Sequence, residues 1–289
     1  MISARHQRDH VGNERDLDLL RLCPRTTHRH RGNRSSCSLS MTVQWPKGYA
    51  LKSFDVIDST NEEAKRLAAA GEAGPIWISA GSQTAGRGRR GRNWHSPTGN
   101  LAATLMLRPS KTASACAQLS FVAAIAARDA LSALAPGLEL RVKWPNDVLA
   151  GGRKIAGILL ESASQGDALP AWLAIGVGMN LAAHPEDTEF PATSLSALGG
   201  MAPPKPDEAL LHLAANFAKW YEVWRGYGFA PIRDAWLARA AGLGGRIRAR
   251  LAHEETSGVF EGIDENGALL LRTGGGSVRA IPAAEVFFA

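Results

Sequence analysis

Cysteine is scarce in this sequence of 289 residues, which contains only Cys23, Cys37 and Cys116. The three are widely separated and form no Cys-x-x-Cys pair, so neither a disulfide framework nor a zinc site is expected. The N-terminus also lacks the apolar core of a signal peptide. Together these absences are typical of a reducing compartment, and we expect a cytoplasmic protein.

Long apolar runs are missing as well. The most apolar stretch starts at Ala113 and meets Arg128 and Asp129 before it reaches the roughly 20 residues that cross a bilayer. We therefore expect no membrane association. Hydrophobic residues still make up 45% of the chain, enough for one large folded domain and a small one.

The net charge of +6 is unevenly distributed along the chain. Residues 1–40 contain eight arginines and four acidic residues, whereas the rest contains 25 basic and 23 acidic residues. Because the body is nearly neutral, its basic character is local rather than a general surface for polyanions.

Residues 1–41 are rich in Arg, His and Ser and have little apolar periodicity. Such a composition cannot build a core, so we predict a disordered basic tail. Two alternatives are a nucleic-acid-binding arm and a true start at Met41, where the patterned sequence opens.

Residues 42–240 alternate between helical and strand patterns. Residues 58–71 read as a helix with a capping box, pairing Ser59 with Glu62 and Thr60 with Glu63, and with Gly71 as its stop. Further helices are expected over 113–134, 207–228 and 231–240, and strands over 75–80, 100–107, 138–147, 154–162 and 172–181. This order predicts an α/β (α+β) domain in which helices cover one sheet.

Residues 241–289 have a different texture. Short alternating segments are separated by turn residues at 254–255, 265–267 and 274–276. The pattern predicts a small β-barrel as a second domain.

The stretch "GSQTAGRGRRGRNW", residues 81–94, places four arginines on a glycine-rich backbone. Gly86, Gly88 and Gly91 let the backbone approach a ligand, while the guanidinium groups suit phosphate or carboxylate. Because adjacent cations repel one another, we expect this loop to be mobile until an anion binds.

Two nucleotide-binding motifs are absent, since the loop is neither a Walker P-loop nor a G-x-G-x-x-G turn. An RGG-like RNA-binding segment is a rival interpretation, with Trp94 stacking on a base. Such segments usually lie in tails, whereas this one joins two strands, so a small anionic ligand is favoured.

A second polar cluster follows in "KWPNDVLAGGRKIAGILLES". It contributes Lys143, Asn146, Asp147 and Lys154 near the end of one strand and the start of the next. Pro145 should interrupt the strand there. Gly157 indicates close approach by a ligand, and the glycines of "IGVGMN" indicate a backbone segment or a ligand nearby.

In their order and spacing, five motifs from about residue 53 onward resemble those of the biotin protein ligases: "DSTNEEA", "QTAGRGRRGRNW", "KWPNDV", "GRKIAGILLE" and "IGVGMNL". The resemblance implies a mixed-sheet catalytic domain related to class II aminoacyl-tRNA synthetases, followed by an SH3-like barrel. It also implies two reactions. Biotin and ATP give biotinyl-5′-AMP, and the biotinyl group then passes to a lysine of a biotin carboxyl carrier protein, with magnesium as cofactor.

The same resemblance assigns roles to residues. Biotin-binding residues would be Ser59, Thr60, Asn61, Gln83, Gly86, Arg87, Gly88, Arg89, Lys154, Gly157, Leu159 and Gly176. Residues for ATP or the adenylate would be Arg89, Arg92, Trp94, Lys143, Asn146 and Asn180. Catalytic residues would be Lys154, Arg89 and Asp147, and Asp147 would also hold magnesium.

Two features depart from the family pattern. Residues 1–40 do not resemble the winged helix of members that repress transcription, so we expect no specific DNA binding and a monomer or weak homodimer. The final "AEVFFA" lacks an arginine that some relatives have there, which leaves open how the barrel contributes to the ATP site.

Two alternatives to a biotin ligase stay open at this point. Lipoate ligases and octanoyltransferases share the fold, but their Arg-Arg-x-Ser-Gly-Gly-Gly stretch is missing. A nucleic-acid-binding protein that uses the arginine loop and the basic tail is the alternative from another class.

Overall fold

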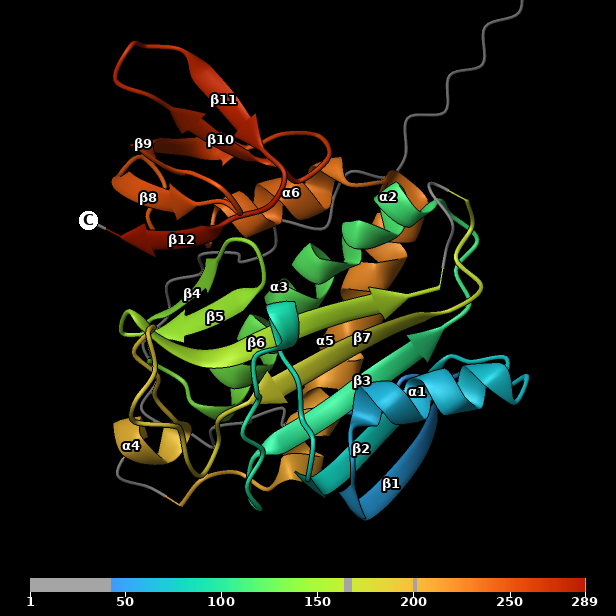
Figure 1. Ribbon diagram of the computed structural model, residues 1–289. Coiled ribbons are helices and arrows are strands. Elements are labelled where there is room, and N and C mark those ends of the chain that lie inside the picture. The colour runs from blue at the N-terminus through green and yellow to red at the C-terminus, as the bar shows by residue number, and fades with distance from the viewer. Residues whose placement is uncertain (1–42, 164–167, 200–201, 289) are drawn as a thin grey trace, which may run out of the picture. The chain divides into compact units, whose positions relative to one another are not determined.

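The larger domain is built around a mixed seven-stranded sheet (Figure 1). Its strands lie in the order β1-β2-β3-β7-β6-β5-β4. The computed structural model describes residues 43–163, 168–199 and 202–288, so the expectation for residues 1–41 lies outside it. β1 pairs with β2 in parallel and the other neighbours are antiparallel. The strands are β1 Ala50–Ile57, β2 Ile76–Gln83, β3 Leu101–Leu107, β4 Leu140–Lys143, β5 Asp147–Ala150, β6 Arg153–Ser162 and β7 Leu173–Met179.

Alternating side chains cover both faces of this sheet, which is why helices pack on each. Trp77, Leu105 and Ile175 face a layer built mainly from α3 (Leu119–Leu134) and α5 (Pro206–Tyr227). α2 (Ala113–Ala117) and α6 (Ala230–Leu237) extend that layer.

The opposite face of the sheet carries α1 (Thr60–Ala69). There Ile78, Met106 and Ala174 of the sheet pack against Ala64 and Leu67 of the helix. Figure 1 shows α1 in front of the sheet and α5 behind it. Two short elements, η1 (Arg89–Gly91) and α4 (Leu195–Gly199), lie in connecting segments.

A five-stranded antiparallel sheet follows, in the order β11-β10-β9-β8-β12. Its strands are β8 Arg246–Arg250, β9 Glu255–Ile263, β10 Leu269–Arg272, β11 Val278–Ile281 and β12 Glu285–Phe288. The Trp144 indole N–H donates to the Gly267 carbonyl at 2.9 Å, which joins this small domain to the β4–β5 hairpin. Its fold agrees with the SH3-like barrel expected from the sequence.

Two strands were not anticipated. β1 alternates between half-buried and exposed side chains, so it has no apolar run. β5 begins at Asp147 immediately after the Trp144–Asn146 turn, where the sequence indicated only the end of one strand and a loop. The helix expected over 113–134 is interrupted at Gln118, which is the C-cap of α2 and the N-cap of α3.

The predicted capping box is wrong. Ser59 is the N-cap of α1, but its side chain makes no capping hydrogen bond. The first helical N–H, that of Thr60, donates instead to Gln83 Oε1 at 2.8 Å. Both glutamates of the predicted box form ion pairs instead. Glu62 pairs with Lys65 and Arg87, and Glu63 pairs with Arg66.

One helical segment is longer and more apolar than the expectation from composition allowed. Residues Ala113–Leu134 are, by length and composition, sufficient to cross a membrane despite Arg128 and Asp129. More than half of the most apolar part of this segment is buried inside the protein. Its apolar surface is therefore accounted for by packing against the sheet and α5.

Candidate functional site

One row of residues crosses five strands on the face that carries α1. Ala102 lies opposite Gly178, which lies opposite Gly157, and the row continues through Asp147 to Lys143. Directly paired residues share a face of the sheet. The row thus consists of three positions with little or no side chain, followed by an acid and a base.

Trp94 lies on the two glycines of this row. A Cβ added to Gly178 would lie 2.3 to 2.5 Å from three atoms of the Trp94 indole, and one added to Gly157 would lie 3.0 Å from Trp94 Cζ3. Only glycine leaves room for so close an approach. The group that these glycines admit is therefore a side chain of the arginine loop.

A second row lies two residues further along the strands. Thr104 is opposite Gly176, which is opposite Leu159. Asn61, from the start of α1, occupies the space over Gly176, where an added Cβ would be 2.3 Å from Asn61 Oδ1. Ser59 and Thr60 precede it and are also buried. This end of the site is polar but uncharged.

The arginine loop is folded back on itself. The backbone N–H of Trp94 donates to the Gly86 carbonyl at 2.9 Å, and the backbone N–H of Gly88 donates to the Arg92 carbonyl at 2.7 Å. A Cβ on Gly86 would be 2.5 Å from the Trp94 carbonyl oxygen. Arg90 takes a left-handed conformation, with φ of 58°, to close the turn.

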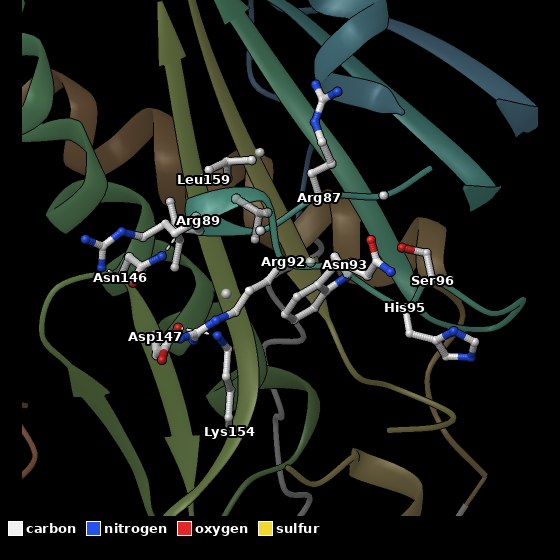
Figure 2. A pocket seen from close by; sticks show the side chains of 18 of the residues that line it. Arg87, Arg89, Arg92, Asn93, His95, Ser96, Asn146, Asp147, Lys154 and Leu159 are labelled. Carbon is white, nitrogen blue, oxygen red and sulfur yellow. Dashed lines mark hydrogen bonds and ion pairs between the residues drawn. The ribbon is translucent and has the colours of Figure 1, made fainter. Parts of the chain in front are cut away.

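Carboxylates from three separate elements neutralise most of the loop. Arg87 pairs with Glu62 of α1, and Figure 2 shows it pointing toward α1, away from Arg89 and Lys154. Arg92 pairs with Glu285 of β12 and lies 3.6 Å from Glu189. These partners reduce the repulsion expected between the loop arginines, and the expected mobility of the loop stays a prediction.

Arg90 shares the partner of Arg92. Its guanidinium lies 3.4 Å from Glu285. Burial alone would raise the pKa of Glu285, but hydrogen bonds from Arg250 and Arg92 outweigh it and lower this pKa to about 2. Glu285 therefore remains a carboxylate throughout the neutral range.

Two cations of the site differ from the others. Among the described residues Arg89 and Lys143 form no ion pair, and both are substantially withdrawn from solvent. Burial, reinforced by Arg90, lowers the pKa of Arg89. Burial lowers the pKa of Lys143 to about 8, although Asp147 opposes that shift. Desolvated cations without counterions favour an anionic ligand.

Neighbouring side chains hold both cations in place. Arg89 Nη1 donates to Asn146 Oδ1 at 3.4 Å, and Asn146 Nδ2 donates to the Ile158 carbonyl at 2.5 Å. Lys143 Nζ lies 3.5 Å from the centre of the Phe190 ring. An aromatic face partly replaces the solvation that the ammonium loses.

Lys154 is a third cation of the site, after Arg89 and Lys143. Its Nζ lies 2.6 Å from Asp147 Oδ1 and 5.5 Å from the centre of the Trp94 ring. Figure 2 shows Lys154 and Asp147 side by side, below Arg89 and Asn146. The described residues contain no group of three His, Cys, Asp or Glu side chains that could hold a metal by themselves.

A cavity of about 800 Å³ connects the two ends. Every residue to which the sequence assigned a site role lines this cavity. Two of these side chains are directed elsewhere. The guanidinium of Arg87 is held by Glu62, and Asn180 Nδ2 donates to the Thr193 carbonyl at 3.1 Å.

Several neighbours of the cavity were not anticipated from the sequence. Ser96 accepts a hydrogen bond from Gln83 at 2.9 Å, Thr104 Oγ1 lies 2.6 Å from Asn61 Oδ1, and Glu189, Phe190 and Glu285 contact site residues as described above. Each is an isolated residue outside any motif. Strand register and the docking of β12, rather than a local sequence pattern, bring them to the site.

Comparison with known proteins agrees with this arrangement. Residues 53–180 match the Biotin/lipoate A/B protein ligase family, and residues 242–289 match the Biotin protein ligase C terminal domain. A biotin–[acetyl-CoA-carboxylase] ligase from Paracoccus denitrificans is 53% identical over 237 residues, covering 80% of this chain and 97% of that protein. This chain belongs to the biotin protein ligases.

Other members of the family are more distant. The bifunctional ligase/repressor BirA of Bacillus subtilis is 37% identical, over 83% of this chain and 74% of its own length. The biotin protein ligase from Aquifex aeolicus, solved in complex with biotin and ATP, superposes with a TM-score of 0.72 at 26% identity, over 83% of this chain and 99% of that one. The family and the fold class inferred from five motifs are thus confirmed.

The stacking of Trp94 on the sheet generates a prediction. Gly178→Ala should displace the indole and loosen the loop, because the added Cβ overlaps the ring. We expect trypsin to cleave after the loop arginines at least about fivefold faster. Gly226→Ala is the matched control, since nothing lies within 4 Å of its added Cβ. Equal cleavage rates in both variants would contradict the stacking.

Proposed function

We propose that this biotin protein ligase catalyses an adenylyl transfer followed by an acyl transfer in the cavity described above. In the first, a carboxylate oxygen of biotin attacks the α-phosphorus of ATP, forming biotinyl-5′-AMP and releasing pyrophosphate. In the second, the ε-amino group of a carrier-protein lysine attacks the acyl carbon. An amide forms, AMP leaves and the amine loses a proton.

One observation carries this proposal, namely that Arg89 and Lys143 are desolvated cations without a carboxylate partner among the described residues. An ATP triphosphate supplies the missing negative charge. The uncharged end of the cavity, with Thr60, Asn61 and Leu159, suits the neutral ring system of biotin. Bound in this way, biotin would extend its carboxylate toward Lys154.

Electrostatics explains the need for so many cations in the first step. The carboxylate and the triphosphate repel each other, and negative charge grows around the α-phosphorus as the new bond forms. Fixed donors such as Arg89 and Lys154 stabilise that charge more than the ground state. Asp147 orients Lys154 through their ion pair of 2.6 Å.

Magnesium would fit this site only as a partner of the phosphates. Among the described residues three carboxylates line the cavity, Asp147, Glu189 and Glu285, and each is already paired with a basic side chain, Asp147 with Lys154. Asp147 would contribute one ligand, and phosphate oxygens and water would supply the others. When bound, the ion would neutralise triphosphate charge.

The arginine loop serves both steps in this proposal. The loop residues Gly86, Arg87, Gly88 and Arg92 would cover the adenylate and shield its mixed anhydride from water, while Trp94 holds the loop to the sheet. The acceptor is a lysine of a biotin carboxyl carrier domain, and the reaction takes place in the cytoplasm. The expectations of no DNA binding and of a monomer or weak homodimer remain predictions.

Biotin is favoured over lipoate for two reasons. The match of residues 242–289 is specific to the biotin protein ligases. The Arg89–Asn146 contact also comes from the arginine loop, the motif that set this sequence apart from the lipoate branch. The residues of the uncharged end, including Ser59, Gln83 and Gly176, are assigned to biotin on that basis, and so is Gly157 beneath Trp94.

The direct test is incubation with biotin, Mg-ATP and a purified carrier domain, followed by mass spectrometry of the carrier. We expect the addition of one biotinyl group to a single lysine. Lipoate in place of biotin should leave the carrier unmodified. Modification by lipoate but not by biotin would reject the proposal.

A substitution probes the first step separately. Lys154→Ala should slow biotin-dependent pyrophosphate release by about 100-fold, because a donor that stabilises the developing charge is removed. Lys52→Ala is the matched control, since it breaks a lysine–glutamate pair of 2.8 Å outside the cavity. If both variants release pyrophosphate at the wild-type rate, Lys154 has no role in adenylation.

The lowered pKa of Lys143 makes ATP use dependent on pH. In the free enzyme this group is a cation below a pKa of about 8 and becomes neutral as the pH rises through that value. The kcat/KM for ATP should therefore fall about tenfold between about pH 7 and pH 9. Lys143→Arg keeps its charge over this range and should abolish the decline. An unchanged midpoint in the variant would assign the titration to another group.

A further inference from the structure

Glu161 lies beside the uncharged end of the cavity and has no part in the reaction described so far. It follows Leu159 by two residues on β6, so both side chains share the face that carries α1. Its Oε2 accepts a hydrogen bond from Asn61 Nδ2 at 2.7 Å. Its other contact, with Arg87, is longer at 3.8 Å.

This carboxylate determines which way the Asn61 amide faces. A carboxylate can only accept hydrogen bonds, so the amide NH2 must point to Glu161 and Oδ1 must point away from it. Asn61 is 5% exposed and is wedged over Gly176, so bulk water offers little competition. The amide of an asparagine next to a neutral group could instead take either orientation.

The amide in turn orders the hydroxyl groups behind it. Thr104 is fully buried, and its Oγ1 lies 2.6 Å from Asn61 Oδ1 and 2.8 Å from Thr60 Oγ1. Because Asn61 Oδ1 can only accept, the single Thr104 proton goes to it. The shorter contact of Thr60 Oγ1, 2.8 Å to Thr104, is then a hydrogen bond only if Thr60 donates its proton there and not to Gln83 Oε1 at 3.1 Å.

The chain of hydrogen bonds ends at Gln83. Its Oε1 accepts the Thr60 N–H at 2.8 Å and lies 3.1 Å from the Thr60 hydroxyl oxygen, while its Nε2 donates to Ser96 at 2.9 Å. With the Thr60 proton directed to Thr104, lone pairs of Thr60 Oγ1 and Gln83 Oε1 remain available at the cavity. This end then presents acceptors, which suit a ligand that donates N–H groups.

We propose that Glu161 is a positioning residue for biotin selection. Through Asn61 and Thr104, it keeps the uncharged end of the cavity in the acceptor state that the N–H groups of a cyclic urea require. This inference rests on the proposed function, because it takes biotin as the ligand. Glu161 itself need not touch the substrate.

Glu161→Met tests the inference, because it removes the acceptor with little change in side-chain length. Asn61 Nδ2 then loses its partner, and the amide turns its NH2 toward Thr104. By titration calorimetry we expect biotin to bind about tenfold more weakly. Glu161→Gln retains an acceptor oxygen, so it should recover part of the affinity. It also provides a second variant if the methionine variant does not fold.

Glu62→Met is the matched control, since Glu62 is the other carboxylate partner of Arg87 but has no bond to Asn61. We expect its affinity for biotin to stay within about twofold of wild type. An equal loss in the Glu161 and Glu62 variants would assign the effect to Arg87 and overturn the proposal.

Kinetics provides the second measurement. In Glu161→Met the KM for biotin should rise, while kcat at saturating biotin and the KM for ATP remain near wild type. A fall in kcat with an unchanged KM for biotin would overturn the positioning role. Failure of the wild-type protein to bind biotin would instead reject the proposed function, so the two failures are distinguishable.

Discussion

The contact of Trp94 with the bare backbone of Gly157 and Gly178 is the interaction on which the site depends. Two glycines at paired positions of β6 and β7 remove both Cβ atoms beneath the indole. An aromatic ring can then lie directly on a sheet, where side chains normally intervene. The hydrogen bond from the Trp94 N–H to Gly86 closes the base of the arginine loop, so fixing this ring also fixes both ends of the loop.

Given a fixed loop, the distribution of its charges decides what the cavity attracts. Arg87 is paired with Glu62 of α1, and Arg90 and Arg92 are paired with Glu285 of β12. Arg92 also lies near Glu189, the residue that precedes Phe190. Those partners cancel charge that would otherwise destabilise the folded loop. Of the described cations that line the cavity, Arg89 and Lys143 form no ion pair, and both lie where solvation is reduced. The protein thus pairs three of the four loop arginines and Lys154 with carboxylates and leaves Arg89 and Lys143 without a direct partner.

Much of the site could be predicted from sequence because its residues occur in runs. Each of the five motifs is local, and the sheet brings their ends together, so the motif residues assigned to the site all line one cavity. The residues that were missed are single side chains at positions set by pairing. Thr104 acts only because β3 register places it opposite Gly176, and nothing in its own neighbourhood marks it. β1 was missed for a related reason, since a half-exposed edge strand carries no apolar run.

The sequence left open how the barrel contributes to the site, and the structure shows two contacts by which it does. Glu285 of β12 contacts Arg90, Arg92 and Arg250, which ties the charge of the arginine loop to a strand of the small domain. Phe287 of the same strand stacks on Phe190, with 4.7 Å between ring centres, and Phe190 in turn covers the Lys143 ammonium. One strand therefore supplies the counterion for two loop arginines and supports the aromatic face beneath a cavity lysine. Because both effects act through side chains that line the cavity, Glu285 and Phe190, the barrel influences the charge and the shape of the cavity directly.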